Sequence, residues 1–562
     1  MNQATSSGES SRKHLWAVHP FLFAAFPCLS IYSQNVQYAP IGDLGVVLAK
    51  SLVGAATVYL PLRLVFKSRD LAAVIASALI VTAFSFSPLR AVLDGRTFLG
   101  VDLGHVRYVF AINASALLVL GLSLFHQREA LSRWTAKANG FGGILVAIAL
   151  VFSVLGNISP PPRERSQGGE TMSPIRFTDT SIFPENSARP DIYYIVLDGY
   201  GRADVLADLY DQDNSEFIEY LAREGFYVAE SSTSNYPTTI HSLSSALNMD
   251  YIPALFPDGA ESITPFSLGD LIKDSRLVRI LKEHFGYTFV AHSSGWYFSS
   301  CEAADLYLSP ANPIPGPSEL ESAVFALTPV RFAIERLFRR WSPYGYHRRE
   351  ILYTLEGLPE VAQIEAATFT FAHVLVPHPP FVFGPEGEDV SSRDEPYSLQ
   401  DHAQIERAGS ANEALQEYRR KYRDQVVFVN KMVRKAIDGI LRNSATPPII
   451  ILQGDHGPGS LRSNSMLEEQ DDEKIKAWER FSILNAYYFP FGGSSQLYPT
   501  IMPVNTFRVM LRYYFGAELD LVAPRKIWSG YDPVNRFKEA SYPSGSPMSN
   551  EPRESSRLGG AP

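Results

Sequence analysis

The sequence predicts a two-part fold: an α-helical domain of five transmembrane spans, followed by an α/β domain with a mostly parallel central sheet. Three observations predict it. Long apolar stretches fill residues 1–157, and a connection rich in proline and glycine covers 158–190. Strand-like and helix-like runs then alternate over 191–534. The end, 535–562, is rich in Ser, Pro and Gly, which predicts a disordered tail.

Five apolar stretches follow one another in the first part of the chain. Each is about 17–23 residues long, the length needed to cross a hydrocarbon core of about 30 Å. A cleaved signal peptide is the alternative for the first stretch, but no small-x-small cleavage site follows it. The stretches are Leu15–Tyr32, Leu44–Phe66, Leu71–Pro88, Val106–Phe125 and Phe141–Asn157.

Lysine and arginine in the connections between these stretches predict the orientation. The N-terminal segment carries Arg12 and Lys13, and the second and fourth connections are also basic. The first connection, Ser33–Asp43, has no basic residue, whereas the third has Arg90 and Arg96. This bias predicts a cytoplasmic N-terminus, and five spans then place everything after about residue 158 outside the cytoplasm.

The second part of the chain reads as alternating strands and helices. Asp191–Leu197 is a short, almost continuous apolar run, as expected of a strand buried on both faces. Ser215–Gly225 is amphipathic and ends at a glycine, and Leu415–Leu441 reads as a long charged helix. Such alternation predicts a parallel sheet between helices. Further predicted strands are Tyr287–Ala291, Thr368–Val376 and Ile449–Leu452.

The composition limits the possible partners and sites. The chain has 562 residues and a formal net charge of −9, with no basic stripe, so nucleic acid is not an expected partner. Its two cysteines are Cys28, in an apolar run, and Cys301, in the polar half. This placement predicts neither a disulfide between them nor a thiolate metal site.

Two predicted strands end in acidic residues. Asp198-Gly199 follows the first, and Gly454-Asp455-His456-Gly457 follows the last. Ligands of open α/β sheets gather at the carboxyl ends of the strands, and carboxylates with one imidazole suit a divalent metal. The alternative is that each aspartate caps the turn after its strand. The two motifs together favour a metal site.

Two further segments carry reactive side chains. Thr238 and Thr239 precede a helical run, so either is a candidate nucleophile or simply the helix N-cap. His373 lies in a predicted strand, and His378 stands in the proline-rich loop after it. A lone histidine is usually structural, but two at this spacing indicate that at least one belongs to an active site.

These motifs, in this order, resemble the alkaline phosphatase/sulfatase superfamily. With five preceding spans, the layout from about residue 12 to 530 looks like lipoteichoic acid synthase and the lipid A phosphoethanolamine transferases. The resemblance implies a sulfatase-like (alkaline phosphatase-like) extracytoplasmic domain on the bacterial cytoplasmic (inner) membrane. It also implies one divalent metal ion, Mn, Zn or Mg, held by Asp198, Thr239, Asp455 and His456.

The resemblance assigns roles to the remaining residues. The family has a serine three residues after its catalytic threonine; Thr239 with Ser242 fits this pattern, so Thr239 is the predicted nucleophile and Thr238 the fallback. His378 matches a histidine that contacts the substrate phosphate, and His373 the one five residues earlier. His292, after the predicted strand Tyr287–Ala291, is expected to line the pocket.

The chain also departs from its relatives. Sulfatases with formylglycine need Cys or Ser at the nucleophile followed by x-Pro-x-Arg, which Thr239 and the residues after it do not provide. Two-zinc relatives use a late histidine, and no histidine follows His456, which favours a single metal. Asp198 stands where both transferase groups have Glu, and the disulfides of the phosphoethanolamine transferases are missing.

The resemblance implies a phosphotransferase. We expect a phospholipid head group, phosphoglycerol or phosphoethanolamine, to pass through a phosphorylated Thr239 to an extracytoplasmic glycan. Its partners are then a membrane lipid donor and a glycan acceptor, and the sequence specifies no oligomeric state. Two alternatives remain: a hydrolase of phosphate or sulfate esters, and an inactive membrane scaffold or sensor with the same fold.

Overall fold

The computed structural model describes residues 16–99, 101–126, 130–157, 175–178, 182, 189–257, 259–311, 316–400, 411–461, 470–543 and 545–547. Most of the predicted connection 158–190, and residues 548–562 of the predicted tail, therefore lie outside the described residues. The chain divides into two compact units. One comprises Met1–Pro161 with Pro317–Ala333, and the other Pro162–Gly316 with Ile334–Pro562.

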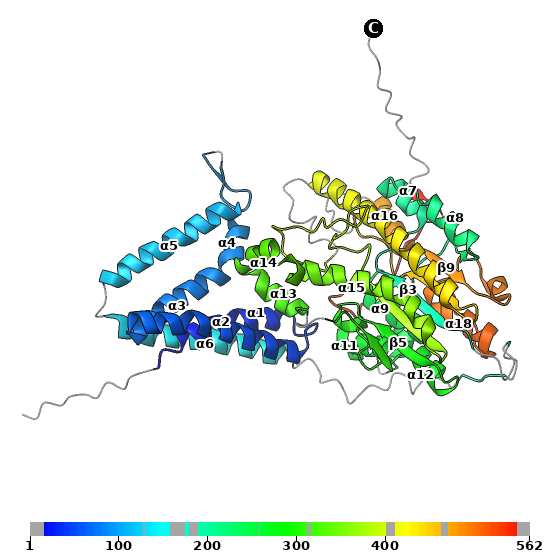
Figure 1. Ribbon diagram of the computed structural model, residues 1–562, viewed down its shortest axis with the longest axis horizontal. Coiled ribbons are helices and arrows are strands. Elements are labelled where there is room, and N and C mark those ends of the chain that lie inside the picture. The colour runs from blue at the N-terminus through cyan, green and yellow to red at the C-terminus, as the bar shows by residue number, and fades with distance from the viewer. Residues whose placement is uncertain are drawn as a thin grey trace, which may run out of the picture. The chain divides into compact units, whose positions relative to one another are not determined.

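The first unit is helical (Figure 1). Helix α1 packs against α2, α3 and α6 through the small or apolar side chains of Ala24, Cys28 and Leu29, which are buried. A two-residue strand pair, β1 (Thr97–Phe98) with β2 (Val101–Asp102), follows the fourth helix. The helices are α1 (His19–Gln34), α2 (Ile41–Phe66), α3 (Arg69–Phe84), α4 (Phe86–Leu93), α5 (Val106–His126) and α6 (Leu131–Asn157).

Three helices among the described residues are long and apolar enough to cross a membrane: α2, α5 and α6. A fourth span is counted if α3 and α4, which meet at a bend of 46°, form one broken crossing. Helix α1 has only 16 described residues. Apolar helices that could cross a membrane are therefore present, but five spans stay a prediction.

A segment from the middle of the chain belongs to this helical unit. It contains α13 (Glu319–Ala326) and the start of α14 (Val330–Leu337). Lys50 of α2 forms an ion pair with Glu321 of α13, and the backbone N–H of Ser87 donates to the carbonyl of Leu327 at 3.1 Å. No local pattern predicts this insertion, because its contacts join positions far apart in the chain.

The second unit is built on a seven-stranded sheet, counted among the described residues, with strand order β4-β9-β8-β3-β7-β5-β6. The sheet is mixed: β3, β5, β6, β7 and β8 run parallel, whereas β9 is antiparallel to both of its neighbours. The strands are β3 (Ile192–Leu197), β4 (Tyr227–Val228), β5 (Thr288–His292), β6 (Leu306–Leu308), β7 (Thr368–Val374), β8 (Ile449–Gly454) and β9 (Asn485–Tyr488).

Helices cover both faces of the sheet (Figure 1). Because successive side chains of a strand point to opposite faces, Tyr193 and Ile195 of β3 join the core under α16, while Tyr194 packs edge-on against Phe507 of α18 at 4.9 Å. One layer comprises α7 (Ala203–Tyr210), α8 (Ser215–Arg223), α15 (Pro343–Gly357), α16 (Ala411–Asn443) and α17 (Gln470–Phe481). The other comprises α9 (Thr239–Asn248), α10 (Ile252–Leu255), α11 (Pro265–Lys273), α12 (Arg276–Glu283) and α18 (Pro503–Phe515).

A short antiparallel pair lies near the end of the described chain. Strand β10 (Ile527–Trp528) pairs with β11 (Lys538–Glu539), and the N–H of Ala540 donates to the carbonyl of Lys526 at 2.9 Å. The predicted disordered tail begins at 535, and the structure differs there because this backbone pairing fixes residues that composition alone marks as unstructured.

Candidate active site at the strand ends

Strand register brings the two predicted acidic motifs together. Strands β3 and β8 are parallel neighbours, and Leu197 pairs with Gly454. The next residues, Asp198 and Asp455, therefore emerge side by side at the carboxyl edge of the sheet. The N–H of Gly199 donates to Asp455 Oδ1 at 3.0 Å, and both carboxylates are buried.

His373 joins these carboxylates from the neighbouring strand β7. Its Nε2 lies 3.5 Å from Asp198 Oδ2, and ligand atoms of Asp198, His373 and Asp455 all lie within 4.8 Å of one another. The other ring nitrogen, Nδ1, lies 2.8 Å from Ser299 Oγ, which fixes the ring. We predicted His373 as a substrate contact, but the structure places it among the candidate metal ligands.

His456 lies beside the same group. Its Nε2 is 3.4 Å from Asp198 Oδ1 and 3.5 Å from Asp455 Oδ2. Its Nδ1 is 2.9 Å from the carbonyl of Gly457, so Nδ1 carries the hydrogen and Nε2 presents a lone pair. Gly457 has no room for a side chain, since a Cβ there would lie 2.0 Å from the carbonyl oxygen of Glu479.

The candidate nucleophile begins α9 at the same place. Thr239 Oγ1 lies 3.1 Å from His456 Nε2. Ser242, one turn later, donates from Oγ to the carbonyl of Asp455 at 2.6 Å and so joins the helix to the acidic loop. Thr238 Oγ1 instead lies 2.7 Å from His241 Nδ1. Of the two threonines, Thr239 is therefore the one that faces the cluster.

The cluster has the donors and the charge that a divalent cation needs. Asp198 Oδ1, Asp455 Oδ2 and His373 Nε2 are buried and have no hydrogen-bond partner among the described residues. Unpartnered buried carboxylates are costly unless a positive charge compensates them. Oxygen and imidazole donors converging at this spacing fit one divalent ion such as zinc or manganese.

The histidines around the cluster also act on Asp198. Burial alone raises the pKa of its carboxyl, but His378, His373 and His456 lower it by more. The net effect holds the pKa of Asp198 well below its ordinary value. Asp198 is consequently a carboxylate over the physiological range, as a metal ligand must be.

The two remaining predicted residues lie in different places. His378 is close to the cluster. Its ring centroid is 6.1 Å from that of His456, and its backbone N–H donates to the backbone carbonyl of Asp198 at 3.0 Å. His292 ends β5 and is buried, with neither ring nitrogen hydrogen-bonded among the described residues. Burial lowers the pKa of His292 to about 4. Strand β5 lies next to β7, with Ala291 paired to Phe371, but His292 is not among the residues whose ligand atoms converge in the described part of the chain.

Sequence reasoning missed two residues near the cluster. Arg480, at the end of α17, places Nη2 3.3 Å from His456 Nε2. His347 of α15 is buried, and the pKa of its ring is lowered to about 3, first by burial and then by His378. Neither follows a strand or forms a local motif, so only the tertiary structure identifies them.

Comparison with known proteins gives structural neighbours only. No protein-family model matches the chain, and no curated protein matches its sequence. Phosphoethanolamine transferases and sulfatases are among the solved structures that it resembles. Those proteins are themselves members of the alkaline phosphatase/sulfatase superfamily.

The matches are distant in sequence. The periplasmic domain of EptC from Escherichia coli, in complex with Zn, matches with a TM-score of 0.41 and 12% identity, over 67% of this chain and 100% of that one. The soluble domain of lipooligosaccharide phosphoethanolamine transferase A from Neisseria meningitidis gives 0.35 and 11%, over 59% and 89%. A 2-O GAG sulfatase gives 0.36 and 13%, over 61% and 78%. The roles of individual residues rest on this chain's own geometry.

Proposed function

We propose that this protein is a metal-dependent membrane phosphotransferase. It moves a phospholipid head group, phosphoglycerol or phosphoethanolamine, to an extracytoplasmic glycan through a phosphorylated Thr239. The observation that supports this most is the position of Thr239 Oγ1, 3.1 Å from His456 Nε2 and next to two unpartnered buried carboxylate oxygens. A hydroxyl in that position can act as a nucleophile toward a bound phosphoryl group.

The first step forms the bond between Thr239 Oγ1 and phosphorus. The bond from phosphorus to the diacylglycerol oxygen breaks, and the hydroxyl proton of Thr239 ends on that leaving oxygen. His456 Nε2 holds the hydroxyl in place, because its other nitrogen is committed to the Gly457 carbonyl. Thr239 also begins α9, and the N-terminus of a helix favours the phosphate anion.

The second step reverses the roles. An acceptor hydroxyl oxygen forms a bond to phosphorus, the bond to Thr239 Oγ1 breaks, and the acceptor's proton returns to Thr239. A divalent cation bound by Asp198, Asp455 and the neighbouring histidines would neutralise charge on the phosphoryl oxygens and favour the ionised threonine hydroxyl. Arg480, buried beside His456, adds a permanent positive charge next to the reacting group.

The helical unit supports a lipid donor. Three described helices are long and apolar enough to cross a bilayer. Such helices would hold the chain in the membrane, where phospholipids occur. We place the protein in the bacterial cytoplasmic membrane, with the cluster on the extracytoplasmic side, where glycan acceptors are found. The metal is Mn, Zn or Mg, since oxygen ligands with imidazole suit each of them.

Intact-mass analysis after exposure to phospholipid tests the proposal. The full chain in detergent is incubated with phosphatidylglycerol or phosphatidylethanolamine, and the added mass is assigned by peptide mapping. We expect one head-group phosphate on Thr239, none in Thr239→Ala, and a normal adduct in Thr238→Val. The proposal is contradicted if Thr239 in metal-loaded protein stays unmodified with both lipids.

The fate of the adduct separates the alternatives. Release of free head-group phosphate without any glycan product identifies a hydrolase. A protein that neither binds a divalent metal nor forms an adduct is a scaffold. Label appearing on added glycan, and lost in Thr239→Ala, supports the transferase.

A further inference from the structure

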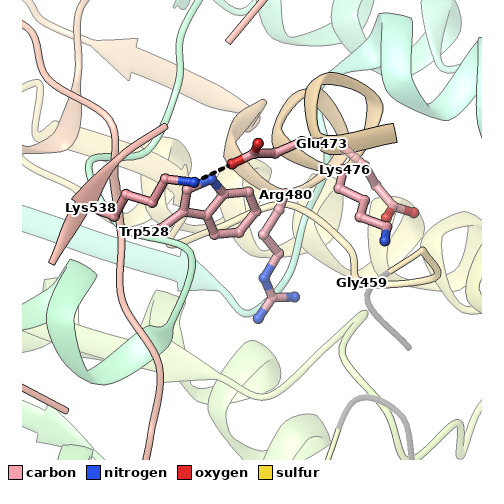
Figure 2. Close-up of a pocket in the computed structure, with 7 residues that line it drawn as sticks. Gly459, Glu473, Lys476, Arg480, Trp528 and Lys538 are labelled. Atoms are coloured by element: carbon pink, nitrogen blue, oxygen red, sulfur yellow. Dashed lines mark hydrogen bonds and ion pairs between the residues drawn. The ribbon is translucent and has the colours of Figure 1, made fainter. Parts of the chain in front are cut away.

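Arg480, which contacts His456 of the cluster, also lines a cavity of about 290 Å³. Figure 2 shows the residues that line this cavity. Helix α17 contributes several of its lining residues, and the β10–β11 pair contributes Trp528 and Lys538. Figure 2 shows side chains from both elements drawn around one space. The lining therefore combines an aromatic ring with charged groups, which is typical of a site for a polar ligand. Its α17 residues are Glu473, Lys476, Glu479 and Arg480.

Arg480 connects this cavity to the nucleophile. Its guanidinium donates from Nε to the Pro237 carbonyl at 2.6 Å and from Nη1 to the Gly457 carbonyl at 3.0 Å. Its Nη2 is 3.3 Å from His456 Nε2, which in turn lies 3.1 Å from Thr239 Oγ1. A ligand in the cavity is thus separated from the reacting oxygen by the width of one or two side chains.

The charges that line the cavity do not cancel. Lys538 pairs with Glu473 at 2.9 Å. Glu479 is buried, and its carboxylate oxygens accept hydrogen bonds from the backbone N–H groups of Ser460 and Leu461. Burial raises the pKa of this carboxyl. Lys476 forms no ion pair in the described part of the chain. With three cations and two carboxylates in its lining, the cavity keeps a net positive charge, and Lys476 is its cation without an ion pair among the described residues.

Trp528 supplies a flat apolar surface with one polar atom. Its ring is held edge-on by Phe481, with centroids 4.9 Å apart. Its Nε1–H is buried and has no hydrogen-bond partner among the described residues. A buried indole usually finds an acceptor for this hydrogen. A ring-shaped ligand in the cavity would cover the exposed part of the indole.

We propose that this cavity is the acceptor subsite and binds a sugar ring carrying an anionic group, phosphate or carboxylate. The ring packs on Trp528, and the anion lies at Lys476 and Arg480. This assignment rests on the proposed transferase function. A cationic head group such as ethanolamine would meet the same positive charges and be repelled, so the cavity suits the acceptor better than that donor.

Calorimetric titration of the full chain in detergent tests the subsite without requiring turnover. The Thr239→Ala protein is titrated with glucose 6-phosphate, glucuronate, glucose and inorganic phosphate. We expect at least one of the two anionic sugars to bind at least tenfold more tightly than glucose and than inorganic phosphate. The two anionic probes distinguish phosphate from carboxylate as the preferred group.

Variants assign the contacts. Lys476→Ala should weaken binding of the anionic sugar about tenfold, and Lys476→Arg should restore it. Trp528→Ala should weaken both the anionic sugar and glucose, and Trp528→Phe less so. Lys474→Ala is the matched control, because Lys474 lies on the same helix, is exposed and does not line the cavity. It should bind as the parent does.

Three results would overturn the subsite. They are equal affinity for glucose and both anionic sugars, inorganic phosphate binding as tightly as the sugars, and unchanged binding in Lys476→Ala and Trp528→Ala. Because Thr239 is absent in these titrations, they do not depend on transfer. Failure of the adduct on Thr239 would remove the proposed function while leaving the binding result intact, so the two failures are distinguishable.

Discussion

The cluster at the strand ends and the cavity beside it are formed by different kinds of structural element. In the cluster, Asp198, His373 and Asp455 sit on or directly after three adjacent parallel strands, so backbone register sets their spacing. In the cavity, Lys476 and Lys538 reach in on long side chains from a helix and a two-strand pair. The first arrangement is fixed by the fold, and the second can be adjusted one side chain at a time.

This difference matches what each region is proposed to do. A phosphoryl-transfer centre must hold its groups to within fractions of an ångström, and short side chains on buried strands achieve that. A subsite that selects an acceptor needs only complementary charge and shape. We therefore expect substitutions in the cluster to have large effects and substitutions in the cavity to have moderate ones.

The largest effect is expected for Asp455→Asn. Loss of the carboxylate charge removes a metal ligand, so metal affinity should fall by at least about 100-fold and transfer should be abolished. Metal content by mass spectrometry and label transfer from phospholipid measure both. Asp274→Asn, at an exposed position, is the control. Stoichiometric metal with normal transfer in Asp455→Asn would show that the cluster is not the metal site.

A pair of histidine variants sharpens the boundary of the cluster. His373→Gln should weaken metal binding by about 10–100-fold, because Nε2 lies among the candidate ligand atoms. His292→Gln should change metal affinity far less, because His292 is not among the residues whose ligand atoms converge in the described part of the chain. Titration with a chromogenic metal competitor measures both. Equal losses of metal affinity in the two variants would contradict the assignment of His373, and not His292, to the metal ligands.

Thr238→Val separates stability from chemistry. The change leaves His241 Nδ1 without its hydroxyl partner in a buried site, which should cost about 1–3 kcal/mol of unfolding free energy. Transfer activity should persist, because Thr238 faces away from the cluster. Thermal unfolding and adduct formation are the measurements. Loss of the adduct in correctly folded Thr238→Val would instead favour Thr238 as the nucleophile.

Acid should destabilise the protein partly through His292. Burial lowers the pKa of the His292 imidazole to about 4 in the folded protein, against 6.5 for an exposed histidine. The unfolded chain therefore binds the proton more tightly than the folded protein does. Stability is full above pH 6.5 and falls as the pH drops toward 4, by about 2 kcal/mol at pH 5. The fall in Tm between pH 7 and pH 5 should be smaller in His292→Leu. Identical falls in both proteins would contradict this assignment.

Much of the central sheet of the second unit was predictable from local pattern. Asp191–Leu197 and Ile449–Leu452 are continuous apolar runs, and both became central strands, β3 and β8. Helix α16 was predicted, as Leu415–Leu441, from a long charged run of helical character. The two-residue strand β4 and the antiparallel β9 were missed, because short or edge strands carry too little apolar pattern to be recognised.

Local pattern predicted only those site residues that follow a strand. Asp198, Asp455 and His456 were predicted because they come directly after buried runs. Thr239 was chosen over Thr238 from the family resemblance, because Ser242 lies three residues later. The grouping of His373 with the carboxylates depends on β7 lying next to β3, which no local pattern specifies. Arg480 reaches His456 from the end of α17, and long-range contacts of this kind leave no signal in the sequence.

The most direct measurement of the central claim is the position of the cation. Crystals of the full chain soaked in Mn²⁺ should show one anomalous peak at about 2.0–2.3 Å from a carboxylate oxygen of Asp198 and of Asp455, with an imidazole nitrogen beside it. Thr239 Oγ1 should lie next to that peak. Manganese bound elsewhere, with no peak between Asp198 and Asp455, would contradict the account.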